Sequence, residues 1–192
     1  VQTCALPISR MKANIVLLPG DGIGPEVIQA TQKVLAQVAA TYDHQFSYTE
    51  QLIGGCSIDA HGTALTEDTL GACLTADAIL LGAVGGPKWD DPTAKVRPEQ
   101  GLLGLRKGLG TFANLRPVRP HADLMDASPL RPERLEGVDL VVVRELTGGI
   151  YFGERGRRPL SDGEQAFDTM LYSDAEVRRI AHLAFKLARG RR

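Results

Sequence analysis

The stretch Val141–Glu154, VVVRELTGGIYFGE, decides how this chain is interpreted. Its β-branched start is typical of a buried strand. The strand runs directly into Arg144, Glu145 and two glycines, and Tyr151 follows in the next segment. Ligands of open α/β sheets bind beyond the carboxyl ends of strands, where an arginine can grip a carboxylate and a tyrosine can carry a proton. A surface turn followed by a core tyrosine is an equal alternative for this stretch alone, so other segments must decide between the two.

The first half of the chain alternates apolar strand patterns with helix patterns. A tight turn with three glycines, residues 19–24, separates the first strand from the first helix, and Pro25 suits the first position of that helix. This β-α-β-α-β order predicts right-handed crossovers and a mainly parallel sheet. The predicted elements are a strand at 15–18, a helix at 25–38, a strand at 45–52, a helix at 65–74 and a buried strand at 78–84.

The second half is less regular. We predict a short helix at 102–109 and an extended segment at 112–120, whose prolines confine it to a sheet edge or a domain crossing. Ser173 and Glu176 form a capping-box pattern. The helix that they begin should bury one face, and no strand follows for that helix to cover. The residues expected on that face are Val177, Ile180, Ala181, Ala184 and Leu187.

Composition excludes several classes of protein. The 192 residues carry a formal net charge of −1 with both signs mixed, which argues against nucleic-acid or polybasic membrane binding. No apolar run approaches the ~18–20 residues that span a bilayer. Three widely spaced cysteines fit neither a disulfide framework nor a zinc site, which predicts a cytoplasmic protein. The four histidines form no pair with metal-ligand spacing.

The individual motifs leave alternatives open. The glycines at 20, 22 and 24 have the spacing GxGxG rather than the GxGxxG of dinucleotide-binding folds, and a structural turn is the favoured interpretation. Arg106, Arg116 and Arg144 lie at the ends of three elements and predict a substrate with more than one carboxylate, against the alternative of three solvated arginines. Leu103 lies three residues before Arg106 on one helix, and spacing alone favours core packing for that leucine.

Together these segments closely resemble the 3-isopropylmalate dehydrogenase family of β-decarboxylating hydroxyacid dehydrogenases. The resemblance runs from Met11 to Arg192 and implies an α/β two-domain fold with a mixed, mainly parallel sheet, present as its N-terminal half. Residues 11–111 would begin the first, cofactor-side domain, and residues 112–192 would begin the second, substrate and dimer domain. Residues 1–10 are expected to be a non-native leader. The segments that carry the resemblance are LLPGDGIGPEV at 17–27, LLGAVGGPKW at 80–89, PEQGLLGLRKGLGTFANLRPVRP at 98–120 and VVVRELTGGIYFGE at 141–154.

The resemblance implies an activity and its requirements. It implies oxidative decarboxylation of (2R,3S)-3-isopropylmalate to 4-methyl-2-oxopentanoate with reduction of NAD, in leucine biosynthesis, by a cytoplasmic homodimer. Relatives that act on tartrate or methylmalate are not excluded by these residues. Relatives that act on isocitrate use polar residues in place of Leu102 and Leu103, because an added carboxylate unpaired against two leucines costs several kcal/mol, on the order of 3 or more.

The resemblance also implies residue roles. Arg106, Arg116 and Arg144 would bind the malate carboxylates, Tyr151 would donate a proton to the enol or enolate, and Leu102 and Leu103 would contact the isopropyl group. The residues expected against the nicotinamide end of NAD are Gly85, Gly86, Pro87, Lys88, Trp89 and Glu99.

Further family requirements are expected beyond residue 192. These are a lysine, the aspartates that bind Mg²⁺ or Mn²⁺, and the adenosine-binding segment. We therefore expect the 192 residues alone to be inactive, and a subunit-interaction module is the competing interpretation.

Overall fold

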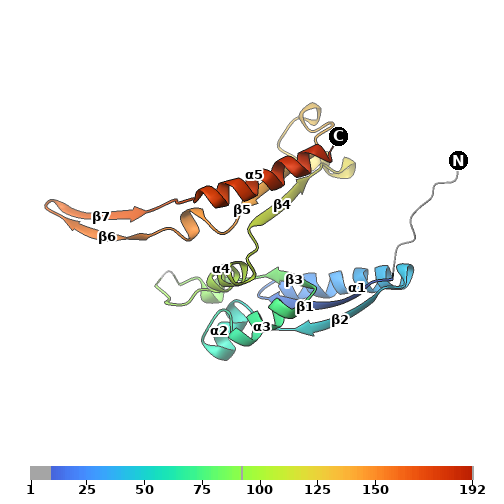
Figure 1. Ribbon diagram of the computed structural model, residues 1–192, viewed down its shortest axis with the longest axis horizontal. Coiled ribbons are helices and arrows are strands. Elements are labelled where there is room, and N and C mark those ends of the chain that lie inside the picture. The colour runs from blue at the N-terminus through green and yellow to red at the C-terminus, as the bar shows by residue number, and fades with distance from the viewer. Residues whose placement is uncertain (1–9, 92, 192) are drawn as a thin grey trace. The chain divides into compact units, whose positions relative to one another are not determined.

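The computed structural model describes residues 10–91 and 93–191. The expected leader at 1–10 lies outside the described residues except for Arg10. The chain divides into two units, Val1–Leu109 and Gly110–Arg192 (Figure 1). Each unit has its own sheet, helices and hydrogen bonds, and each is described by itself.

Unit 1 is built on a three-stranded parallel sheet with the strand order β2-β1-β3. In the register, Lys12 of β1 pairs with Gln45 of β2, and Ile15 of β1 pairs with Ala78 of β3. The predicted β-α-β-α-β order and the parallel pairing are confirmed. The elements of unit 1 are β1 Lys12–Gly20, α1 Gly24–Tyr42, β2 Gln45–Glu50, α2 Gly55–His61, α3 Glu67–Thr75, β3 Ala78–Ala83, a short 3₁₀ helix Pro87–Trp89 and α4 Pro98–Leu109.

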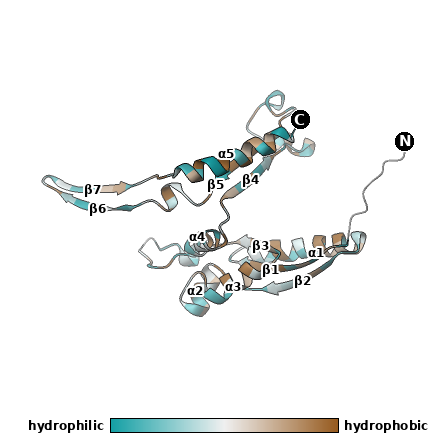
Figure 2. Ribbon diagram, in the orientation of Figure 1, coloured by the Kyte–Doolittle hydropathy of each residue, from teal (hydrophilic) through white to brown (hydrophobic). Residues whose placement is uncertain are grey.

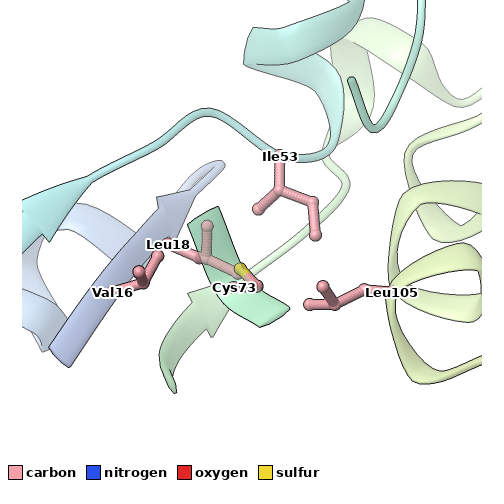
Figure 3. Close-up of a cluster of buried hydrophobic side chains, with 5 residues drawn as sticks. All are labelled: Val16, Leu18, Ile53, Cys73 and Leu105. Atoms are coloured by element: carbon pink, nitrogen blue, oxygen red, sulfur yellow. The ribbon is translucent and has the colours of Figure 1, made fainter. Parts of the chain in front are cut away.

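The core of unit 1 lies on both faces of β1, because successive side chains of a strand point to opposite faces. Val16 and Leu18 face one cluster with side chains from three other segments, and Ile15 and Leu17 face a second cluster with Ile28 of α1. Full burial of such a side chain stabilises the fold by about 1.5–3 kcal/mol. Figure 3 shows the members of the first cluster, which are Val16, Leu18, Ile53, Cys73 and Leu105.

The strand predicted to be buried at 78–84 is only partly buried. Ala78 is exposed and the other residues of β3 retain partial exposure. Within the described residues β3 pairs with β1 alone, so one of its edges and part of its faces have no covering element. The prediction of full burial was therefore wrong for these residues.

The glycine turn after β1 is held by close backbone approach. Gly20 has φ +71°, and a Cβ at this position would lie 1.9 Å from the carbonyl oxygen of Ala83. The backbone N–H of Asp21 donates to the same carbonyl at 2.7 Å. Only glycine allows the turn to approach the end of β3 this closely.

Unit 2 contains two antiparallel strand pairs and one long helix. β4 pairs with β5 in a two-stranded sheet, and α5 packs against β5. The prediction that prolines confine residues 112–120 to a sheet edge is confirmed. The elements are β4 Ala113–Val118, β5 Leu140–Glu145, β6 Arg155–Leu160, β7 Gly163–Asp168, α5 Asp174–Arg189 and short 3₁₀ helices at Ala122–Ala127, Pro132–Arg134 and Gly149–Tyr151.

Strand β5 was predicted to be buried, and this is wrong for one of its faces. Val141 and Val143 face α5, whereas Leu140 and Val142 are 45% and 48% exposed. The difference arises because α5 covers one face of the β4-β5 pair, and no described element of unit 2 covers the other. An unbroken run of β-branched residues in the sequence does not show whether one face of a strand is covered or both.

Helix α5 begins at the predicted capping box. The Ser173 hydroxyl accepts from the Glu176 backbone N–H, and the Glu176 carboxylate accepts from the Ser173 backbone N–H. The predicted inner face is half-buried except for Val177, which is 53% exposed, so that residue was misplaced. Figure 2 shows hydrophobic and hydrophilic residues alternating along α5, as an amphipathic helix requires.

One helix and one hairpin of two strands were not predicted. Helix α2 follows the glycine pair at 54–55, and β6 and β7 form a hairpin in which Leu160 pairs with Gly163. The hairpin was missed because β6 reads RGRRPL, which has neither alternation nor an apolar run. Within the described residues, none of the helices has the length and apolar character needed to cross a membrane.

Candidate active site

Strand register places two of the predicted arginines on one face of unit 2. Asn114 lies opposite Arg144, and Arg116 lies opposite Val142 two residues further along β4. Residues related in this way share a face of an antiparallel pair. This is the face turned away from α5, and both arginines are exposed on it. The Arg116 Nε donates to the Asn114 Oδ1 at 2.9 Å, which orients that guanidinium.

Tyr151 lies beside Arg144. The Arg144 Cζ is 5.4 Å from the centroid of the Tyr151 ring, within the range of a cation–π contact. Tyr151 is 51% exposed and ends the short 3₁₀ helix Gly149–Tyr151. The Arg155 guanidinium fixes this turn, because it donates to the carbonyls of Ile150 and Tyr151 at 3.2 and 3.0 Å. The structure thus brings Arg116, Arg144 and Tyr151 to neighbouring exposed positions of unit 2.

Glu145 holds the turn between Arg144 and Tyr151, and its side chain lies on the face of β5 opposite to that of Arg144. This carboxylate is 7% exposed and accepts from the backbone N–H groups of Thr147 and Gly148 at 2.7 and 2.8 Å. It also accepts from the Thr147 hydroxyl at 2.8 Å and from the Arg179 guanidinium of α5 at 2.6 Å. The Arg179 guanidinium in turn lies 4.9 Å from the Phe112 ring centroid. Helix α5 is therefore tied to the end of β5 that carries the arginine and tyrosine.

The Glu145 interactions predict a pH-dependent stability. Burial acts to raise the pKa of Glu145, but hydrogen bonds from Thr147, Gly148 and Arg179 outweigh it and hold the pKa below its ordinary 4.5. A carboxyl whose pKa is lower in the folded chain stabilises the fold above its unfolded pKa, and the contribution disappears as the pH falls through the folded value. We expect Glu145→Gln to lower the free energy of unfolding by about 1–3 kcal/mol at neutral pH, and by progressively less as the pH falls below 4.5 and through the folded pKa. Urea unfolding across this pH range measures this, and a loss that does not change with pH would contradict it.

In unit 1, α4 carries the predicted isopropyl contacts and one arginine. Leu105 is 4% exposed and belongs to the core cluster around Val16. Leu102, Leu103 and Arg106 are half-buried on the same helix. The helix therefore directs Leu105 into the core, and Leu102 and Leu103 each keep part of their surface accessible.

The predicted cofactor residues are gathered at the end of β3. Gly85 has φ +95°, and a Cβ there would lie 3.2 Å from the Glu99 Oε1, so Glu99 of α4 lies next to this glycine. Gly85 and Gly86 are half-buried, and a Cβ on Gly86 would lie 3.5 Å from the Trp89 ring. The residues predicted for this role therefore form one continuous segment with Glu99 beside it.

Sequence reasoning missed the carboxylate that organises this region. Asp21 is 4% exposed, and its side chain accepts from the backbone N–H groups of Gly55, Cys56 and Gly85 at 2.7, 2.7 and 2.8 Å. It therefore joins the glycine turn, the start of α2 and the start of the Gly85–Trp89 loop. The available signal was an aspartate between two glycines, because short acidic side chains in turns bind backbone N–H groups. Glu145 was missed as well, because its partner Arg179 lies 34 residues later in the chain.

The predicted site residues are divided between the units. Leu102, Leu103, Arg106, Glu99 and the Gly85–Trp89 loop belong to unit 1, whereas Arg116, Arg144 and Tyr151 belong to unit 2. Over residues 10–91 and 93–191, no group of three or more His, Cys, Asp or Glu side chains could hold a metal ion. The described side chains therefore do not supply a ligand set for Mg²⁺ or Mn²⁺.

The chain is similar to known enzymes over most of its length. The 3-isopropylmalate dehydrogenase of Anaeromyxobacter dehalogenans is 66% identical over 183 residues, which are 95% of this chain and 52% of that protein. The Bacillus subtilis enzyme of the same name is 53% identical over 184 residues, which are 95% of this chain and 50% of that protein. The chain thus spans about half the length of the curated relatives that it matches.

Solved structures show the same relationship. A β-decarboxylating dehydrogenase from Thermococcus kodakarensis matches with a TM-score of 0.60 at 33% identity, over 92% of this chain and 46% of that chain. An isocitrate dehydrogenase from Methylococcus capsulatus matches with a TM-score of 0.70 at 25% identity, over 92% and 47%. Residues 14–192 match the family model described as isocitrate/isopropylmalate dehydrogenase. The chain therefore belongs to the isocitrate/isopropylmalate dehydrogenase family.

Proposed function

We propose that the protein to which these residues belong oxidises and decarboxylates 3-isopropylmalate with NAD, in leucine biosynthesis. The observation that carries this proposal is the placement of Arg144 beside Tyr151, with Arg116 on the same strand-pair face. A guanidinium beside a phenol, with a second guanidinium on the same strand-pair face, suits a dicarboxylate that must be held and then protonated. High identity to relatives named 3-isopropylmalate dehydrogenase supports the choice of substrate.

The roles proposed for this chain concern binding and proton transfer. Arg106, Arg116 and Arg144 would bind the two carboxylates and fix the orientation of the bond to the departing carboxylate. The Gly85–Trp89 loop and Glu99 would hold NAD, which would supply the hydride acceptor for oxidation of the hydroxyl carbon to a keto group, with the hydroxyl proton released to water. Loss of carbon dioxide leaves its bonding electron pair on the substrate as an enolate. The Tyr151 hydroxyl would then donate its proton to the carbon that lost the carboxylate, directly or through the enol.

The requirements of the whole enzyme are part of the same proposal. The Gly85–Trp89 loop and Glu99 would contact the nicotinamide end of NAD, and the family points to a divalent metal as well. No metal-dependent step is assigned to the described residues, because they lack a ligand set. A homodimer in the cytoplasm is the proposed assembly and location, and the substrate is the proposed small-molecule partner.

Substrate choice tests the proposal. Leu102 and Leu103 would contact the isopropyl group, and a third carboxylate in their place would lie unpaired against two hydrocarbon side chains. We expect NADH formation with 3-isopropylmalate, and a kcat/KM for isocitrate lower by about 10²-fold or more. The assay follows NADH absorbance. It is run on the 192-residue chain alone and on the protein that includes the sequence encoded on either side of it. Comparable rates on isocitrate, or activity on tartrate or methylmalate instead, would contradict the proposed substrate.

A further inference from the structure

The Gly85–Trp89 loop is held by a carboxylate that none of the proposed steps uses. Asp59 of α2 accepts from Lys88 and Trp89 with separate oxygens. The Lys88 Nζ lies 2.6 Å from the Asp59 Oδ2, and the Trp89 Nε1 donates to the Asp59 Oδ1 at 3.2 Å. One side chain therefore satisfies two consecutive residues of the loop, 29 and 30 positions away in the sequence.

Packing reinforces this contact. The Trp89 indole lies against Gly55 of α2, where an added Cβ would come within 2.3 Å of the ring. The Lys88 Nζ lies 5.2 Å from the Trp89 ring centroid, so the ammonium contacts both the carboxylate and the indole. Glycine at position 55 is thus required for the indole to approach the helix.

The other end of the loop is tied to the same helix. The Gly85 backbone N–H donates to Asp21, and the same carboxylate accepts from Gly55 and Cys56 at the start of α2. Helix α2 consequently supports the loop at both ends, through Asp21 at Gly85 and through Asp59 at Lys88 and Trp89. The buried Asp21 joins three segments of unit 1, whereas Asp59 contacts the loop alone, so Asp59 can be changed with less effect on the fold.

We propose that Asp59 is a positioning residue that holds the Gly85–Trp89 loop in the conformation that receives the nicotinamide end of the cofactor. This inference rests on the proposed function, because the cofactor role of the loop belongs to that proposal. A loop ordered before binding does not lose conformational freedom when the ligand binds, so anchoring raises affinity without adding a ligand contact. The side chains of Asp59 and Lys88 are 43% and 66% exposed, and such pairs contribute little to overall stability. The hydrogen bonds from Lys88 and Trp89 lower the pKa of Asp59.

The test uses Asp59→Ala and Asp59→Asn, with Asp68→Asn as the matched control. Asp59→Ala removes both hydrogen bonds to the loop, whereas Asp59→Asn keeps an oxygen acceptor for the Trp89 indole and loses the charge. Asp68→Asn removes the same charge from an exposed position of α3 and none of the loop hydrogen bonds described above. Trp89 is the sole tryptophan of the 192 residues, so in this chain the quenching of its fluorescence by acrylamide reports on the loop directly, and KM is measured on the protein that includes the flanking sequence.

We expect Asp59→Ala to raise the acrylamide quenching constant about twofold and the KM for NAD about three- to tenfold, with kcat changed less than about twofold. Asp59→Asn should lie between Asp59→Ala and the unchanged protein, and Asp68→Asn should match the unchanged protein. Unchanged quenching in Asp59→Ala would overturn the anchoring role. Altered quenching with an unchanged KM for NAD would overturn the link to the cofactor.

The quenching measurement also distinguishes failure of this inference from failure of the proposed function. If the protein that includes the flanking sequence forms no NADH, the proposed function fails, and quenching in the 192-residue chain still decides whether Asp59 anchors the loop. NADH titrated into each variant, with Trp89 emission as the signal, then decides whether the anchored loop favours cofactor binding. Equal NADH affinity in Asp59→Ala and the unchanged protein would overturn the positioning role.

Discussion

Replacing Tyr151 by phenylalanine is expected to lower kcat for 3-isopropylmalate by about 10²- to 10³-fold and to change KM by less than about threefold. Phenylalanine keeps the ring beside the Arg144 guanidinium and removes only the hydroxyl that would donate the proton. Substrate binding depends on the arginines, which the substitution leaves in place. Steady-state kinetics measured by NADH absorbance gives both constants.

A second tyrosine provides the control for this substitution. Tyr48 lies on β2 in unit 1 and is exposed, so Tyr48→Phe removes a phenolic hydroxyl that belongs to a different unit from Arg144 and its turn. It should leave kcat and KM unchanged. An equal loss of kcat and of substrate affinity in Tyr151→Phe would indicate that the hydroxyl binds substrate rather than donating a proton.

Replacing Asp21 by alanine is expected to lower the free energy of unfolding of unit 1 by about 3–5 kcal/mol. The substitution leaves three backbone N–H groups, those of Gly55, Cys56 and Gly85, without the carboxylate that accepts from them. Each of these groups would need a new partner, and water reaches them only in part, because Gly55 is buried and Cys56 and Gly85 are half-buried. Urea unfolding followed by circular dichroism measures the loss.

Asp68→Ala is the matched control for Asp21→Ala, because it removes the same side chain from an exposed position of the same unit. It should change the unfolding free energy by no more than about 1 kcal/mol, the value of an acidic residue in the first turn of a helix. A loss in Asp21→Ala as small as that in Asp68→Ala would show that the three hydrogen bonds do not hold unit 1 together.

The strand and helix pattern of unit 1 could be predicted from the residues because its signals are local. The apolar run at Ile15–Leu18 and the glycine turn after it identify a strand, a turn and the start of a helix without reference to distant segments. Strand β5 was harder, since its three valines predicted burial on both sides and the structure exposes Val142. Burial depends on how many elements cover a strand, and α5 covers only one face of β5.

The residue types of the candidate site could be predicted from the sequence. The carboxylates that hold those residues in place could not. Arginines and a tyrosine at element ends are visible in the sequence, and the resemblance to a known family proposed their roles. The carboxylates that organise the site bind partners far away along the chain, such as Glu145 with Arg179, 34 residues later, and Asp21 with Gly85, 64 residues later. Such pairs follow from tertiary packing and have no periodic signal. Tertiary packing therefore had to be known before these residues could be identified.

The most direct measurement is a crystal structure of the intact enzyme with 3-isopropylmalate bound. The account predicts that the guanidinium groups of Arg106, Arg116 and Arg144 donate hydrogen bonds to the two carboxylates, with the Tyr151 hydroxyl facing the carbon that becomes protonated. The isopropyl group should contact Leu102 and Leu103. A complex in which the diacid binds elsewhere, or in which Tyr151 and the three arginines make no contact with it, would contradict the account.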